Sequence, residues 1–311
     1  MSIFNNKNKV RPELGFGTKN YNKSIRFINP DGTVNIKRTG LGGLKNIDIY
    51  HWLINISLPK LFLVIVSSYT IVNLMFAFAY YCIGAEDFGG VTAVTELDKF
   101  FALFFFSAQT LTTVGYGHVY PVSNSISAVA AAESLIGLLG FALATGLLYG
   151  RFSRPKSDLL YSRNILIAPY KEITGLMFRI ANKMQYELIE CEATVTLSYN
   201  DPETNKREFE QLKLEINKIG FLALSWTVVH PINEESPMKG LTAKDLIKSD
   251  AEFLILIKAT NDTFSQTVHS RYSYKGTDIV EGVRFKPLKQ EADKNGRVVI
   301  SVTDIHKFEK V

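Results

Sequence analysis

Long apolar runs and short alternating runs divide this sequence into two parts of different character. Residues 61–83 are 23 consecutive positions without a charge, and residues 126–150 form a second apolar run in which Glu133 is the only charged side chain. A helix of about 20 residues crosses a hydrocarbon core of about 30 Å. We therefore predict two membrane-spanning helices.

Two shorter apolar segments accompany these runs. Residues 100–111 are 12 apolar-rich positions, too few to span a bilayer, and fit a re-entrant helix. Residues 48–56 place Ile49, Trp52 and Ile56 on one helical face, which favours an amphipathic helix at the membrane interface, with Asp48 able to cap its start. A buried helix of a globular domain is the alternative.

The pattern changes after residue 157. Short alternating runs separated by turns rich in Asn, Asp, Gly and Pro predict strands at residues 194–198, 212–216, 221–229, 253–257 and 297–302. A short strand at 33–38 and a short helix at 241–248 are also expected. We predict a cytoplasmic N-terminal segment (1–46), a membrane α-helical domain (47–155) and an antiparallel β-sandwich resembling an immunoglobulin fold (156–311).

The charge distribution predicts the orientation in the membrane. Residues 1–60 carry ten Lys or Arg against three acids, and Arg151, Arg154 and Lys156 directly follow the second apolar run. Positive flanks are typical of the cytoplasmic side, so we expect a multi-pass protein of the cell inner (plasma) membrane with both termini cytoplasmic. Nucleic acid is not an expected partner, because no binding motif accompanies these basic residues. The N-terminal residues have no signal-peptide pattern.

The sequence gives little support for a disulfide framework, a metal site or a dinucleotide-binding site. Cys82 and Cys191 are the only cysteines and imply neither a disulfide framework nor, with five scattered histidines, a metal cluster. The run Gly40-Leu41-Gly42-Gly43 has Lys45 where a dinucleotide fingerprint needs its third glycine. We expect no organic cofactor and no enzymatic activity.

The segment Thr113-Val114-Gly115-Tyr116-Gly117 follows the predicted re-entrant helix and resembles a potassium-channel selectivity filter. Carbonyls of Thr113, Val114, Gly115 and Tyr116 from four chains, with the Thr113 hydroxyl, can replace the water shell of K⁺. Gly115 and Gly117 accept the positive φ values that such an arrangement needs. A Gly-Tyr-Gly turn in a soluble protein is the alternative, and K⁺ in the filter is the expected bound ion.

The flanking elements resemble the inward-rectifier potassium channel family. The resemblance rests on the interfacial segment before the first span, the run Phe106-Ser107-Ala108-Gln109-Thr110, the β-rich tail, and His230-Pro231-Ile232-Asn233-Glu234-Glu235-Ser236-Pro237. It covers residues 48 to about 285, and the lack of paired extracellular cysteines points to the bacterial branch.

This resemblance implies a homotetrameric K⁺-selective channel and assigns roles to individual residues. Tyr149 falls at the bundle-crossing gate, and Gly137 and Gly146 match positions where the inner helix bends, although close helix packing would also favour glycine. The basic cluster Arg151, Arg154 and Lys156 matches residues that meet lipid phosphates, with simple topology as the alternative. The cytoplasmic pore is implied for Glu190 and for the loop 263–268, with Ser265 and Gln266.

Several positions depart from the family pattern. Gln109 and Val119 replace a charged pair near the filter, so filter support is expected to be neutral, with Glu133 as a further contributor or a protonated, packed side chain. Phe141 lies where strong rectifiers carry an acid. Lys218 and Lys258 fall near other acidic positions of the family, so we expect weak rectification.

Three other functions are alternatives to this prediction. A potassium channel with a nucleotide- or Ca²⁺-binding regulatory domain would need a βαβ tail with a glycine fingerprint. A potassium-uptake transporter subunit would carry several filter-like repeats, whereas this chain has one. A membrane-anchored β-sandwich receptor would not need a filter segment.

Overall fold

The computed structural model describes residues 26–36, 49–92, 94–153, 158–184, 186–201, 206–296 and 298–311. The chain divides into two compact units, one of residues 40–154 and one of residues 1–39 with 155–311. Asp48, Arg154 and Lys156 lie outside the described residues.

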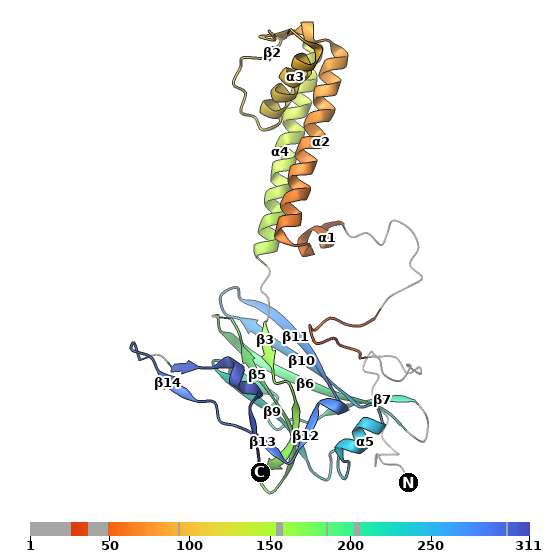
Figure 1. Ribbon diagram of the computed structural model, residues 1–311, viewed down its shortest axis with the longest axis vertical. Helices are drawn as coiled ribbons and strands as arrows, with labels where there is room; N and C mark the ends of the chain where they lie inside the picture. The colour runs from red at the N-terminus through yellow and green to blue at the C-terminus, as the bar shows by residue number, and fades with distance from the viewer. Residues whose placement is uncertain are drawn as a thin grey trace. The chain divides into compact units, whose positions relative to one another are not determined.

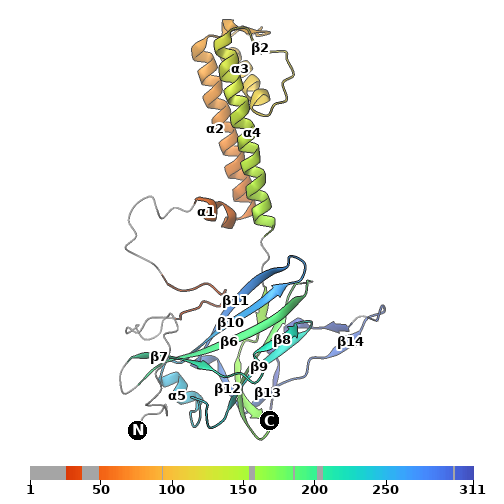
Figure 2. The same cartoon turned by 180° about the vertical axis from the view of Figure 1, so that it is seen from behind.

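The first unit is helical. It contains α1 (Ile49–Asn55), α2 (Leu58–Ile83), α3 (Glu96–Leu111) and α4 (Asn124–Phe152). Helices α2 and α4 run side by side, and the shorter α3 lies at one end of the pair (Figure 1 and, from behind, Figure 2). Only 17% of the most apolar window of each long helix is buried within the chain. Both predicted spanning helices are therefore present, and most of their apolar surface is open to lipid or to other chains.

Capping side chains explain where the helices of this unit begin. Thr95 Oγ1 accepts a hydrogen bond from the Asp98 amide at 3.1 Å, so α3 begins before the apolar run that predicted it. Ser123 caps α4 in the same way, accepting from the Ile126 amide at 3.4 Å. The connections around α3 carry a 3-10 helix, η2 (Ala85–Asp87), and a two-stranded pair of β1 (Phe88–Gly89) and β2 (Tyr120–Pro121).

A buried aromatic cluster fixes α3 against the two long helices. The rings of Tyr80, Phe88 and Phe106 meet edge to face, with centroids 5.1–5.4 Å apart. Val119 is buried in the same cluster. The position at which the family often carries a basic residue is thus apolar and packed in this chain.

The second unit is a β-sandwich. One sheet has the order β11 (Gln266–Lys275), β10 (Glu252–Asn261), β6 (Leu188–Asn200), β7 (Arg207–Leu212), with β8 (Lys218–Phe221) also paired to β6. The other has the order β12 (Ile279–Glu281), β4 (Ile165–Tyr170), β5 (Ile173–Asn182), β3 (Leu159–Tyr161), with β9 (Ser225–Ile232) paired to β5. All these pairings are antiparallel except β4 with β12, which is parallel.

Shorter elements complete this unit. They are α5 (Ala243–Lys248), the 3-10 helices η3 (Gly276–Asp278) and η4 (Val302–His306), and the strand pairs β13 (Val283–Phe285) with β16 (Phe308–Lys310) and β14 (Gln290–Ala292) with β15 (Val298–Ile300).

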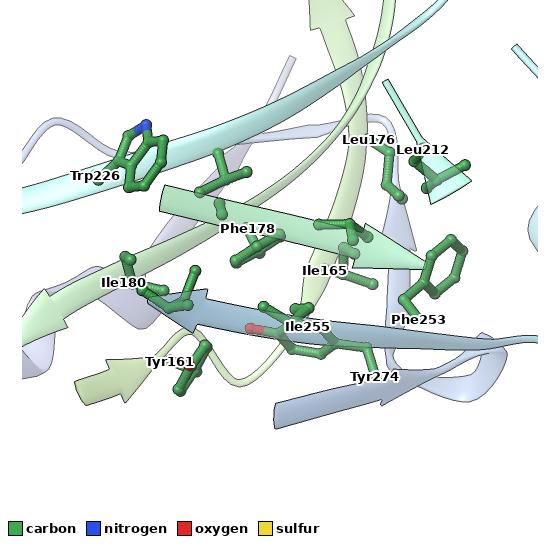
Figure 3. Packing of buried hydrophobic residues seen from close by; sticks show 14 of the residues in the cluster. Tyr161, Ile165, Leu176, Phe178, Ile180, Leu212, Trp226, Phe253, Ile255 and Tyr274 are labelled. Atoms are coloured by element: carbon green, nitrogen blue, oxygen red, sulfur yellow. The ribbon is translucent and has the colours of Figure 1, made fainter. Parts of the chain in front are cut away.

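The core of the sandwich comes from the inward faces of both sheets. Figure 3 shows Phe178 of β5 and Trp226 of β9 on one side and Phe253 of β10 and Tyr274 of β11 on the other. Inward-facing apolar residues alternate with outward polar ones along the strands, which is why the alternating runs predicted this fold.

Three of the predicted strands were wrong in detail. Residues 212–216 are not a strand, because β7 ends at Leu212 and the following segment is tied to β9 by single bonds, such as the Glu215 amide to the Val229 carbonyl at 3.0 Å. The predicted run 221–229 is split between β8 and β9 by a turn. Of the predicted strand 33–38, only an isolated bridge between Ile28 and Val34 is present in the described residues.

Candidate functional site

The filter segment, residues 113–117, directly follows α3 and has an alternating backbone. Thr113, Gly115 and Gly117 have φ values of 60°, 55° and 78°, whereas Val114 and Tyr116 keep negative φ values. Glycine adopts positive φ at little cost, but for a β-branched residue such as threonine it is unusual and strained. Such strain persists only where the surrounding structure holds it.

Two consecutive amides of this segment are held by one oxygen. The Gln109 carbonyl accepts from the Val114 amide at 2.8 Å and from the Gly115 amide at 3.3 Å. In a trans peptide the N–H and the C=O point in opposite directions, and this chain has no cis peptide bond among its described residues. The carbonyls of Thr113 and Val114 therefore both point away from α3, towards the same side.

The side chains of the filter segment are not buried within a single chain. Val114 and Tyr116 are 54% and 76% exposed. Ideal Cβ atoms added to Gly115 and Gly117 would meet no atom within 4 Å. The segment thus presents a row of carbonyls on a surface that the chain itself does not cover.

The two glycines assigned to helix bending have different surroundings. A Cβ on Gly137 would lie 1.9 Å from the Leu111 carbonyl oxygen, so α4 packs here directly on the end of α3. A Cβ on Gly146 would meet nothing within 4 Å. Close packing thus accounts for Gly137 and not for Gly146, and bending at either stays a prediction.

The C-terminal end of α4 contacts α1. Arg151 Nη1 lies 3.2 Å from the Ile54 carbonyl oxygen and also donates to the Ile56 carbonyl, so it satisfies carbonyls at the end of α1. Tyr149, two residues earlier, is 74% exposed, as is Phe141 at 75%. Arg151 is therefore tied to the protein, and its contact with lipid stays a prediction.

The predicted cytoplasmic-pore residues lie on two strand pairs of the sandwich, β6 with β8 and β10 with β11. Glu190 of β6 pairs with Lys218 of β8, with Nζ and Oε1 3.4 Å apart and both side chains more than half exposed. Ser265 and Gln266 lie at the turn between β10 and β11, where Ser265 has φ of 49°. Lys258 of β10 is exposed. The structure brings Glu190 and Lys218 together, and Ser265 and Gln266 together.

The tail motif at His230 is a buried hydrogen-bonded turn. His230 is 3% exposed, with Nδ1 2.7 Å from the Lys213 carbonyl oxygen and Nε2 2.7 Å from Ser236 Oγ. Because a carbonyl can only accept, Nδ1 carries the hydrogen and Nε2 accepts from the serine. Burial lowers the pKa of this imidazole, so the ring is neutral near pH 7.

Some features of these sites could not be read from sequence. The positive φ of Thr113, the double use of the Gln109 carbonyl and the partners of Arg151 depend on the packed backbone. The pairing of Glu190 with Lys218 depends on strand register. No group of three potential metal-ligating side chains occurs in the described part of the chain.

Comparison with known proteins agrees with this arrangement. A family model described as the inward rectifier potassium channel C-terminal domain matches residues 159–311, and one described as an ion channel matches residues 68–154. A solved alkylpurine DNA glycosylase from Pseudomonas fluorescens covers 60% of this chain and 48% of its own, but with a TM-score of 0.21 and 9% identity it carries no argument.

Curated relatives extend the agreement along the chain. The inward rectifier potassium channel Kirbac3.1 of Paramagnetospirillum magnetotacticum is 34% identical over 86% of this chain and 91% of its own length. Human inward rectifier potassium channel 18 is 28% identical over 73% of this chain and 55% of its own. A chicken ATP-sensitive inward rectifier potassium channel 12 is 25% identical over 92% of this chain and 72% of its own length. This chain belongs to the inward-rectifier potassium channel family, in which two apolar helices and an α-helical pore domain are joined to a β-rich C-terminal domain.

Proposed function

We propose that this protein is a homotetrameric, K⁺-selective channel of the cell inner (plasma) membrane with both termini cytoplasmic. The observation that carries the proposal is the filter segment, whose Thr113 and Val114 carbonyls face one side while the Val114 and Gly115 amides donate to the Gln109 carbonyl. Carbonyls of this kind replace the hydration shell of K⁺.

Four copies are needed to complete such a site. One chain offers oxygens from one direction only, whereas a dehydrated cation must be surrounded. The exposed Val114 and Tyr116 side chains and the exposed surface of α4 offer the apolar area that neighbouring chains would bury.

Flux into liposomes tests this proposal. Purified protein should admit K⁺ and Rb⁺ and exclude Na⁺, and Ba²⁺ should block because it resembles K⁺ in size and carries two charges. Gly115→Ala is the matched control, since a side chain at a φ of 55° is strained, and it should abolish K⁺ flux. Equal uptake of Na⁺ and K⁺ by the parent protein would overturn the proposal.

We place the gate at the cytoplasmic end of α4, with Gly137 and Gly146 as the points of bending. Tyr149 is exposed within the single chain, which fits a side chain that meets its three copies at the pore axis. Tyr149→Ala should raise flux and leave the K⁺/Na⁺ ratio unchanged. Unchanged flux would move the gate elsewhere, with the turn at Ser265 and Gln266 as the next candidate.

A further inference from the structure

Four buried polar side chains join three helices in the interior of the helical unit. Asn73 and Tyr80 of α2, Ser107 of α3 and Glu133 of α4 each have no exposed surface. Tyr80 Oη lies 2.5 Å from Glu133 Oε2, Ser107 Oγ lies 3.0 Å from Asn73 Oδ1, and Ser107 Oγ also bonds Glu133 Oε1. We call these four residues the Glu133 network.

Counting hydrogens in the network indicates the protonation state of Glu133. The amide of Asn73 donates to the Tyr69 carbonyl at 2.8 Å, so its Oδ1 faces Ser107 and can only accept. Besides a 3.3 Å approach of Ser107 Oγ to the Asn73 backbone carbonyl, which shares the serine hydrogen with Asn73 Oδ1, the network has three oxygen–oxygen contacts, and Tyr80 and Ser107 supply one hydrogen each. The third hydrogen must come from Glu133, which is therefore a neutral acid that donates to Ser107 and accepts from Tyr80.

The network acts on the part of α3 that holds the filter segment. Ser107 precedes Gln109 by two residues, and the Gln109 carbonyl accepts from both Val114 and Gly115. The same stretch of α4 makes two more contacts with the end of α3: Ser134 Oγ donates to the Thr110 carbonyl at 3.4 Å, and Gly137 packs on Leu111. Glu133 supplies the buried side-chain link in this interface.

We propose that Glu133, as a neutral acid, is a positioning residue that sets the K⁺ selectivity of the filter through Ser107 and Gln109. This inference rests on the proposed function, because it concerns how the filter is held. A filter discriminates between ions by the placement of its oxygens, and a shift of α3 along or around its axis would move the oxygen that anchors Val114 and Gly115. Charge on Glu133 is not required, because its two contacts need one donor and one acceptor.

The experiment compares two replacements of Glu133 in the full-length channel. Glu133→Gln keeps one donor for Ser107 and one acceptor for Tyr80, whereas Glu133→Leu keeps the volume and removes both. Ile126→Val is the packing control, because Ile126 is buried in the same helix and lies outside the network. The readouts are the K⁺/Na⁺ flux ratio and the Ba²⁺ concentration for half block, with tetramer assembly followed by gel filtration.

We expect Glu133→Gln and Ile126→Val to match the parent, and Glu133→Leu to lower the flux ratio by roughly tenfold, which corresponds to about 1.4 kcal/mol of lost discrimination. An assembled Glu133→Leu channel with the parent ratio would overturn the positioning role. Loss of selectivity in Glu133→Gln would contradict the inference that Glu133 acts as a neutral acid. A parent that does not distinguish K⁺ from Na⁺ would instead refute the proposed function.

Ser107→Ala and Tyr80→Phe keep the test decisive if Glu133→Leu does not assemble. Each removes one hydroxyl and little volume. Ser107→Ala should lower the flux ratio more than Tyr80→Phe, because only Ser107 lies on the helix that carries Gln109. If Ser107→Ala keeps the K⁺/Na⁺ flux ratio of the parent, this would contradict the proposal that Glu133 acts on the filter through Ser107.

Discussion

At the scale of single residues, His230 makes the stability of the β-sandwich unit depend on pH. Burial lowers its pKa below the ordinary value of 6.5, despite the opposing bond to the Lys213 carbonyl. Above pH 6.5 the ring is neutral in both folded and unfolded chains. As the pH falls below that value the unfolded chain binds the proton first, so folding stability is lost progressively towards the folded-state pKa.

The direction of this pH dependence can be measured by thermal unfolding of the full-length channel between pH 7.5 and 5.5, followed by tryptophan fluorescence. The parent should lose more thermal stability over this range than His230→Gln, which cannot take up the proton. The variant should be less stable than the parent at pH 7.5, because it disturbs the bonds to Lys213 and Ser236. Parallel pH profiles for the two proteins would contradict the prediction.

Gly137 gives a second prediction at this scale. In an exposed helix interior, Gly→Ala is expected to stabilise by about 0.5–1 kcal/mol, but at Gly137 the added Cβ would collide with the Leu111 carbonyl. Gly137→Ala should therefore destabilise by about 1–3 kcal/mol. Gly140→Ala is the control, since its Cβ would meet no atom within 4 Å. Melting temperatures of the purified channels test this, and a stable Gly137→Ala channel with altered gating would favour bending over packing.

The sequence allowed part of the filter to be anticipated at residue level. Gly115 and Gly117 were expected to adopt positive φ because glycine does so easily, and both do. Thr113 was not, because threonine avoids this region unless neighbours impose it. The role of the Gln109 carbonyl could not be predicted either, because the hydrogen bonds that a backbone carbonyl accepts do not depend on the side chain of its own residue.

At the scale of elements, helices were more predictable than strands. The two spanning helices follow from long apolar runs that need no tertiary information. The strand predicted at residues 212–216 failed because its alternation reflects contacts with β9 through isolated bonds rather than a continuous ladder. The parallel pairing of β4 with β12 could not be predicted from the local sequence pattern either, because strand pairing depends on contacts throughout the sheet.

The contact between α1 and α4 leads to a prediction about lipid. Arg151→Gln removes bonds to the end of α1 as well as a charge, whereas Arg154→Gln with Lys156→Gln removes two charges that follow α4 in the sequence. Each charge near an anionic surface contributes about 1 kcal/mol. The double variant should lower apparent affinity for anionic lipid by roughly fivefold per charge without lowering flux at saturating lipid.

Arg151→Gln should reduce flux in every lipid mixture, because α1 is no longer tied to α4, the helix on which we propose the gate. Liposome flux with graded anionic lipid separates the two effects. A lipid response unchanged in the double variant would reduce Arg154 and Lys156 to determinants of topology. Full flux at saturating lipid in Arg151→Gln would show that its bonds to α1 do not couple the helices.

At the scale of the whole molecule, function depends on surfaces that one chain leaves open. In the described part of the chain, Phe141 and Tyr149 are mostly exposed and the Thr113 and Val114 carbonyls point away from α3, although the sequence predicts a role for each of these residues. In the proposed homotetramer their roles depend on how four copies meet, which neither hydrophobic pattern nor the fold of one chain specifies. Measurements on the assembled channel are therefore the ones that test them.

Rectification is one such property, and it is expected to be weak. Strong block by a cytoplasmic polycation needs acidic side chains along the pore. The helical unit offers Phe141, which is apolar, and in the β-sandwich unit the Glu190 carboxylate is paired with Lys218 at 3.4 Å. Lys258 adds a further exposed positive charge. Even if Lys258 points away from the axis, Glu190 is partly neutralised within its own chain.

Spermine applied to the cytoplasmic face of channels in a planar bilayer tests this prediction. The parent should show weak, shallow voltage-dependent block at micromolar spermine. Lys218→Gln should strengthen block moderately, because it leaves four Glu190 carboxylates unpaired. Phe141→Asp should strengthen it far more, because four carboxylates in a confined, poorly hydrated cavity attract a polycation more strongly than exposed ones. Tight, steep block of the parent would contradict the prediction, and equal block of the parent and Lys218→Gln would show that the ion pair does not limit polycation entry.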